Sequence, residues 1–213
     1  MIMDNIKKAA VSAGAVAVIA GGCDGREKDK AAEELIAKIK DSDAEVRTKA
    51  WLSAGQVGAA AVEPLARVMT DEDLEVARAA KRGLWKVVRD AGRPGRKGGK
   101  RAVVGKLNGL LGDDRPAAVR REVLWMLSEI GDGKSVKPIA ALLSNKLLRE
   151  DARMVLERIG DEKCIAALKA GLKAAPEDFK LNIAQSLRSL GQKVPGLACV
   201  KLVPTKKTNV KPL

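Results

Sequence analysis

The stretch VRREVLWMLSEIG, residues 119–131, decides the fold. Its apolar residues stand at the first, fifth, ninth and twelfth positions, which makes one apolar stripe along an α-helix, and it closes on a glycine, which ends helices. The same template occurs four more times in the chain. The other copies are VRTKAWLSAGQVG (46–58), VARAAKRGLWKVVRDAG (76–92), LREDARMVLERIG (148–160) and FKLNIAQSLRSLG (179–191). Five amphipathic helices therefore share one pattern.

A second apolar-periodic segment precedes each copy and is joined to it by a short polar turn. Two helices with an apolar face each cannot bury both faces by themselves, so the pairs must stack on one another. The sequence therefore predicts an all-α fold, an α-solenoid of about five helical hairpins in one repeat domain, residues 30–192. The preceding segments are 31–40, 59–69, 102–111, 135–143 and 164–174.

The pattern V-R-x-x-A-x-x-x-L-x-x-I-G after an aspartate-rich turn, with Pro64 and Pro138 inside the preceding helices, resembles bacterial HEAT repeats. It is most similar to the short repeats named after phycobilisome lyases. The resemblance implies an ARM-like binding scaffold, a monomer whose second helices form the surface that recognises a protein partner. We expect the recognition surface to include Lys49, Ser53, Lys81, Lys86, Glu122, Glu129, Arg153 and Glu157.

A basic residue occupies the second template position in every copy except the one with Ala77. Such a row of cations is a candidate site for acidic partners. The resemblance implies a structural role instead, in which these residues bond aspartates of the turns in neighbouring repeats, and we favour that interpretation. The basic residues are Arg47, Arg120, Arg149 and Lys180, and the available aspartates are Asp43, Asp73, Asp113 and Asp114.

The chain of 213 residues contains no histidine, which removes the commonest general base and the commonest metal ligand. We therefore predict no catalytic site, no metal and no cofactor. Trp51, Trp85 and Trp125 stand at three different template positions, so we expect them to pack in the core or between repeats rather than share a face. A lyase-type enzyme, which needs a pocket of clustered polar groups, is the less favoured alternative.

The net charge of +13 is concentrated in two segments. Residues 89–101 hold six basic residues against one acidic, and the tail 193–213 holds five basic residues and no acidic one. The alternative function is therefore binding of nucleic acid or another polyanion through these segments. The basic, glycine-rich insertion 93–100 interrupts the repeat spacing. Its candidate polyanion-binding residues, with the one that follows, are Arg93, Arg96, Lys97, Lys100 and Arg101.

The run AVAVIAGGCD, residues 15–24, ends an uncharged segment that is too short for a transmembrane helix and suits a secretory signal. Ala20, two glycines and Cys23 resemble the lipobox of bacterial lipoproteins, with Ala20 where leucine is usual. We predict a signal peptide over 1–22, lipidation of Cys23, a linker over 23–29, and a membrane-anchored protein of the bacterial cell envelope. The alternatives are an ordinary cleaved signal and an uncleaved chain that is cytoplasmic or membrane-anchored.

The other two cysteines are Cys164, at the start of the last repeat, and Cys199, in the tail. In an oxidising compartment a disulfide between them would fasten the tail over the last hairpin. Two separate buried thiols are the alternative, and we expect the rest of the tail to be a disordered basic segment.

Overall fold

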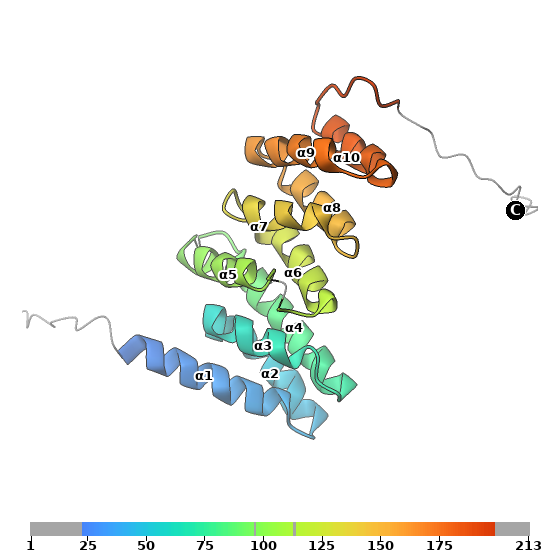
Figure 1. The fold of residues 1–213 in the computed structure, drawn as a ribbon. Helices are drawn as coiled ribbons and strands as arrows, with labels where there is room; N and C mark the ends of the chain where they lie inside the picture. The colour runs from blue at the N-terminus through green and yellow to red at the C-terminus, as the bar shows by residue number, and fades with distance from the viewer. Residues whose placement is uncertain (1–22, 96, 113, 199–213) are drawn as a thin grey trace, which may run out of the picture.

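A computed structural model describes residues 23–95, 97–112 and 114–198 of the chain. Its helices form five hairpins stacked one on the next, which confirms the predicted α-solenoid (Figure 1). The α-helices are α1 (Cys23–Ile39), α2 (Ala44–Val57), α3 (Val62–Val68), α4 (Leu74–Ala91), α5 (Lys97–Gly109), α6 (Ala117–Ile130), α7 (Val136–Ala141), α8 (Arg149–Ile159), α9 (Glu162–Ala174) and α10 (Glu177–Ser189). Two short 3₁₀ turns are η1 (Gly58–Ala61) and η2 (Leu142–Ser144).

The odd-numbered helices form one layer of the solenoid and the even-numbered helices form the other (Figure 1). Contacts run between neighbours: α4 packs on α2 and α6, and α8 packs on α6 and α10. The apolar template positions point between the layers, as the pattern predicts. At the ninth position, for example, the side chains of all five copies are at most 1% exposed: Ala54, Leu84, Leu127, Leu156 and Leu187.

The turns within the first two hairpins are built from an Asp-x-Asp pair. The side chain of Asp71 accepts a hydrogen bond from the backbone N–H of Asp73 at 3.2 Å. The side chain of Asp73 in turn accepts from the N–H of Glu75 at 2.8 Å, which caps the N-terminus of α4. The same two bonds recur with Asp41 and Asp43 before α2. These aspartates therefore set where each second helix begins.

The two prolines of the template occupy equivalent places, since Pro64 is the third residue of α3 and Pro138 is the third residue of α7. A proline in the first turn loses no hydrogen bond, because the N–H groups there have no acceptor within the helix. It cannot stand further along an α-helix without breaking a bond. The α-helical parts of these two segments are short, and a 3₁₀ turn adjoins each: η1 precedes α3, and η2 follows α7.

The closing glycines divide into two groups. Gly58, Gly160 and Gly191 have φ between 66° and 74°, the left-handed conformation that the pattern predicts. That prediction is wrong for Gly92 and Gly131, whose φ angles are −76° and −59°. At Gly131 the requirement is close approach, because a Cβ would lie 2.4 Å from the carbonyl oxygen of Leu127.

Two segments for which the sequence predicted no helix are wholly or partly helical in the structure. Residues 23–29, expected as a linker, are the first part of α1, which extends beyond its first buried residue, Ala32. This segment is rich in charged helix formers, so it continues the helix although residues 25–30 are exposed. Half of the insertion 93–100 also belongs to a helix, since α5 begins at Lys97. The predicted signal peptide, 1–22, lies outside the described residues. No helix within the described ranges is long and apolar enough to cross a membrane.

Replacing Asp73 by alanine is expected to lower the free energy of unfolding by about 1 kcal/mol, because the N-terminus of α4 loses its cap. Urea denaturation followed by circular dichroism measures the loss. The matched control is Glu72→Ala, which removes a neighbouring exposed carboxylate that caps nothing and is expected to change stability by less than about 0.5 kcal/mol. Equal losses in the two variants would contradict this account of the turn.

Candidate functional site

A groove with a volume of about 460 Å³ lies on the exposed side of α2 and α4. Basic residues recur along one face of α4 at spacings of three and four, and Trp85 stands among them. Trp51 of α2 completes the lining. The seven residues of this tryptophan groove are Trp51, Arg78, Lys81, Arg82, Trp85, Lys86 and Arg89.

Each indole in the tryptophan groove has a guanidinium over its ring. The Cζ atom of Arg82 lies 5.9 Å from the ring centroid of Trp51, and the Cζ atom of Arg89 lies 5.2 Å from that of Trp85. Both distances are within the range of cation–π attraction. The two tryptophans and two of the arginines therefore form a pair of stacked units.

The expectation that the three tryptophans do not share a face is wrong for Trp51 and Trp85, which line the same groove. Their template positions differ by four residues, which is about one helical turn, so both point to the same side. The sequence contained this signal. Trp125 stands one position further round its helix than Trp51, is 43% exposed, and does not line the groove.

The indole N–H groups of two tryptophans tie neighbouring repeats together. Nε1 of Trp85 donates to the carboxylate of Glu122 on α6 at 3.3 Å, and Glu122 also pairs with Lys81. Nε1 of Trp125 donates to Asp151 on α8 at 3.1 Å. The predicted packing is confirmed for Trp51 and Trp85, which pack partly buried against the core, whereas Trp125 is exposed and meets the next repeat through its N–H group.

The tryptophan groove carries more positive charge than its neighbours neutralise. Arg78 pairs with Glu75 at 2.7 Å, and Lys81 pairs with Glu122. Within the described part of the chain no carboxylate pairs with the other three cations. These cations are Arg82, Lys86 and Arg89.

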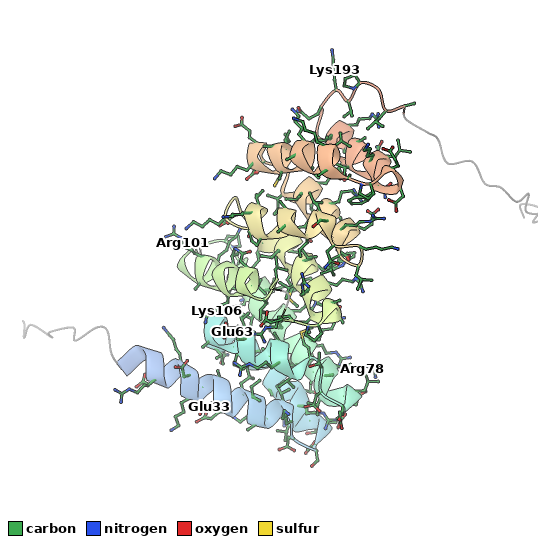
Figure 2. The ribbon with its side chains drawn as sticks, in the orientation of Figure 1. Glu33, Glu63, Arg78, Arg101, Lys106 and Lys193 are labelled. Carbon is green, nitrogen blue, oxygen red and sulfur yellow. The ribbon has the colours of Figure 1, made fainter. Side chains whose placement is uncertain are left out.

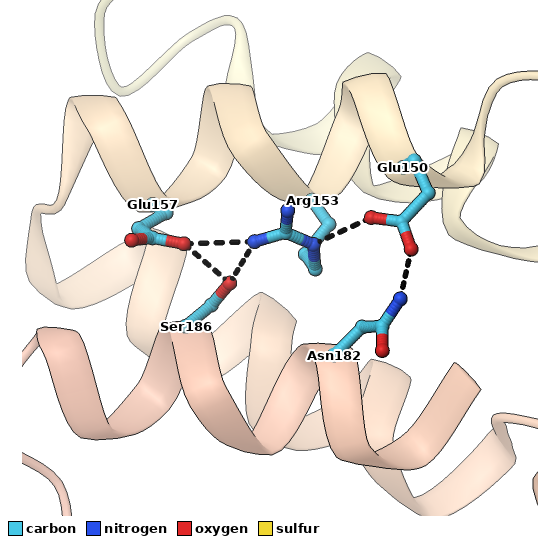
Figure 3. Close-up of polar contacts among 5 residues, drawn as sticks. All are labelled: Glu150, Arg153, Glu157, Asn182 and Ser186. Atoms are coloured by element: carbon cyan, nitrogen blue, oxygen red, sulfur yellow. Dashed lines mark hydrogen bonds and ion pairs between the residues drawn. The ribbon is translucent and has the colours of Figure 1, made fainter. Parts of the chain in front are cut away.

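The even-numbered helices nearer the C-terminus carry a contrasting, internally matched polar network (Figure 3). Arg153 of α8 pairs with Glu150 and with Glu157, both at 2.8 Å, and donates to the hydroxyl of Ser186 on α10 at 2.6 Å. The amide of Asn182 donates to Glu150. The predicted recognition residues Arg153 and Glu157 therefore hold α8 against α10.

The other predicted recognition residues differ in their surroundings. Lys81 and Lys86 line the tryptophan groove, and Glu122 forms its edge. Lys49 and Ser53 are exposed on α2, and Glu129 is exposed on α6.

The row of basic template residues is structural at Arg149. Its guanidinium donates to Asp178, in the first turn of α10 in the next hairpin, at 2.6 and 3.4 Å. It also lies 4.7 Å from the ring centroid of the buried Phe179. The hydrogen bond from Arg149 lowers the pKa of Asp178 below its ordinary value of 3.8. Arg120, at the same template position, is buried.

Two other template residues bond within their own hairpins. Arg47 donates to the backbone carbonyls of Asp41 and Ser42, both at 2.8 Å, rather than to an aspartate side chain. Lys180 pairs with Glu177, one turn earlier on α10. The predicted pairing with turn aspartates of neighbouring repeats is therefore not the general rule.

The predicted polyanion-binding residues do not line a common groove among the described residues. Arg93 pairs with Asp90 at 3.0 Å, and Lys100 is half-buried. Arg101 is exposed on α5, away from Arg78 of the tryptophan groove (Figure 2). Arg96 and the side chain of Lys97 lie outside the part of the chain that the structure describes.

The remaining candidate residues are the cysteines. Cys164 is fully buried, and burial raises the pKa of its thiol to about 11, so it is a poor nucleophile. It forms no disulfide with a described residue, and Cys199 lies outside the described range, so the bridge stays a prediction. Cys23 is the first residue of α1. The described residues contain no acidic or cysteine cluster able to hold a metal ion.

The chain is similar to known repeat proteins. Residues 106–188 match the family model of HEAT repeats. Two similar solved structures are the designed armadillo repeat proteins YIII(Dq.V1)4CPAF, in complex with peptide (KR)4, and YIII(Dq)4CqI. They are 18% and 19% identical, with TM-scores of 0.43 and 0.40, and each similarity covers 76% of this chain and 82% of the other. No curated protein sequence matches the chain. The family match covers 83 of the 213 residues, so the similarity to HEAT repeats is shown for residues 106–188, and repeats of this kind typically mediate protein–protein interaction.

The lowered pKa of Asp178 predicts a pH-dependent contribution to stability. A carboxyl group whose pKa falls on folding stabilises the protein above its ordinary pKa of 3.8, and this stabilisation is lost as the pH falls through the folded-state value. Asp178→Asn is therefore expected to lower the Tm near neutral pH. Its Tm should approach that of wild type once the pH falls below the folded-state pKa of Asp178. Thermal unfolding at a series of pH values measures the difference, with Glu72→Gln as the control. A difference that stayed constant down to the lowest pH would rule out the Arg149 contact as its source.

Proposed function

We propose that this chain is a protein-binding scaffold that docks a partner on its even-helix face, the exposed side of α2, α4, α6, α8 and α10. The observation that carries the proposal is the tryptophan groove, where two indoles line the surface beside three cations that pair with no carboxylate of the described chain. Tryptophan and arginine are the residues that most often supply the binding energy of protein interfaces. Binding is favoured over catalysis because the chain has no histidine.

The distribution of exposed apolar side chains supports the same face. All five large hydrophobic residues that are exposed in the described chain lie on even-numbered helices or in the turn directly before one. Soluble proteins scatter such residues singly, whereas a concentration on one layer is typical of an interaction surface. The five residues are Leu52, Leu74, Trp125, Leu147 and Leu181.

Site-specific photocrosslinking tests the scaffold proposal. A photoreactive amino acid at Leu52 or Trp125, on the even-helix face, is expected to give adducts with a discrete set of proteins in cells of the source organism. The matched controls carry it at Arg67 of α3 or Lys169 of α9, which are exposed on the odd-numbered helices. Adducts of equal number and identity from both layers would contradict docking on the even-helix face.

Membrane attachment through Cys23 is the second part of the proposal. The support is the sequence Ala-Gly-Gly-Cys after an uncharged run, together with the position of Cys23 at the start of α1. The first buried residue of this helix, Ala32, follows nine residues later. At about 1.5 Å per residue, a lipid on Cys23 would stand roughly 14 Å from the packed solenoid. The helix would thus hold the repeat domain clear of the membrane.

Metabolic labelling with a clickable fatty acid tests the anchor in the full-length chain expressed in a bacterium. Cys23→Ala is expected to abolish labelling and to move the protein from the membrane fraction to the soluble fraction. Cys164→Ala, which removes a buried thiol instead, is expected to leave both unchanged. Equal labelling of wild type and Cys23→Ala would remove the lipoprotein proposal and leave the cytoplasmic alternative.

A further inference from the structure

We infer that the tryptophan groove binds an acidic peptide segment of the partner, and that Arg82 and Arg89 are the side chains that grip its carboxylates. This inference rests on the proposed scaffold function and names the chemistry of the partner at that site.

The two stacked arginines are preorganised to bind carboxylates. A guanidinium that lies over an indole keeps its N–H donors at the edge of its plane, where they can meet both oxygens of one carboxylate. Arg82 is held in this way over Trp51, and Arg89 over Trp85. Because the rings restrict the arginine side chains before binding, less conformational entropy is lost when a ligand arrives.

The chain contains a completed example of the same arrangement. Arg149 lies over the ring of Phe179 and binds the carboxylate of Asp178 through two of its nitrogens. In the tryptophan groove the aromatic ring and the guanidinium are both present, but within the described residues no carboxylate pairs with Arg82 or Arg89. The component missing from each stacked unit is therefore a carboxylate.

The edge of the groove already accepts one carboxylate from the chain itself. Glu122 of α6 receives the indole N–H of Trp85 and the ammonium group of Lys81. These two donors therefore suit a carboxylate in this environment. Lys86 lines the same groove without an ion pair to a described residue, so the ligand can meet three unpaired cations within about 460 Å³.

Two features of the even-helix face favour a short acidic peptide over a nucleic acid strand. Single-stranded nucleic acids bind by stacking bases on aromatic rings, but each indole in the groove is already covered on one side by a guanidinium. A phosphate backbone that continued along the solenoid would also pass carboxylates on α6 and α8. These belong to Glu122, Glu129, Glu150, Asp151 and Glu157.

Fluorescence anisotropy with the full-length chain tests the inference. The probes are a labelled glutamate octapeptide, the matched glutamine octapeptide, and a thymidine oligonucleotide of the same length, all at physiological salt. The glutamate peptide is expected to bind at least about tenfold more tightly than either other probe, since hydrogen bonds between charged groups are the strong ones. Tighter binding of the oligonucleotide, or equal binding of the two peptides, would overturn the assignment.

Substitutions identify the residues responsible. Arg82→Gln with Arg89→Gln is expected to weaken binding of the glutamate peptide by about tenfold or more. The control with the same loss of charge is Arg67→Gln with Arg101→Gln, on the odd-numbered helices, and it is expected to stay within about twofold of wild type. Equal weakening by the two pairs would mean that only net charge attracts the peptide, and it would overturn the assigned roles.

Two conservative variants keep the test independent of folding defects. Arg82→Lys with Arg89→Lys retains the charge but loses the planar donor geometry, so most of the affinity should be lost. Glu122→Gln removes a negative charge from the groove edge and releases Lys81, so it is expected to bind the glutamate peptide more tightly than wild type. Weaker binding by Glu122→Gln, or full affinity in the lysine variant, would contradict the inference.

The outcomes separate this inference from the scaffold function. If the even-helix face crosslinks to discrete proteins but the glutamate peptide does not bind, the scaffold proposal stands and the acidic class of partner is wrong. If neither occurs, both fail.

Discussion

The constraint on which the whole structure depends is that no hairpin can bury both of its apolar faces alone. Each repeat is completed by its neighbours, as α4 is by α2 and α6, and the fifth and ninth template positions are buried in every copy. The outward-facing positions of each even-numbered helix lie outside this shared interior. They are therefore free to differ from repeat to repeat, and it is in these positions that the tryptophan groove and the polar network between α8 and α10 differ most.

The solenoid uses its surface charges in two ways. Between α6 and α10, arginines bond across neighbouring helices, Arg149 to the carboxylate of Asp178 and Arg153 to the hydroxyl of Ser186. Such contacts fix how one hairpin sits on the next. Between α2 and α4 the balance is different, because cations outnumber carboxylates and two indoles lie among them. Near α8 and α10 these charged side chains are thus paired within the chain. In the tryptophan groove, cations without a carboxylate partner are available to bind another molecule.

The fold was predictable from sequence because the template repeats the apolar spacing and the closing glycine in all five copies. The site was only partly predictable. The template positions of Trp51 and Trp85 differ by four residues, about one helical turn, which was sufficient to place both side chains on one side. Treating unequal template positions as different faces missed this. The sequence could not show which cations remain unpaired, because their potential partners come from another helix, as Glu122 does for Lys81. The close approach at Gly131 likewise depends on the path of the chain after α6, which the template does not record.

The length of α4 has a consequence for how such repeats change over time. With 18 residues it is four residues longer than α2 or α6, and the added segment includes Arg89. Four residues are close to one turn at 3.6 residues per turn, so the extension keeps the preceding face aligned. Arg89 stands four residues after Trp85, so the two share a face, whereas two extra residues between them would rotate Arg89 to the opposite side. Growth of this helix by whole turns is thus a route by which a repeat protein acquires new surface chemistry while its interior stays unaltered.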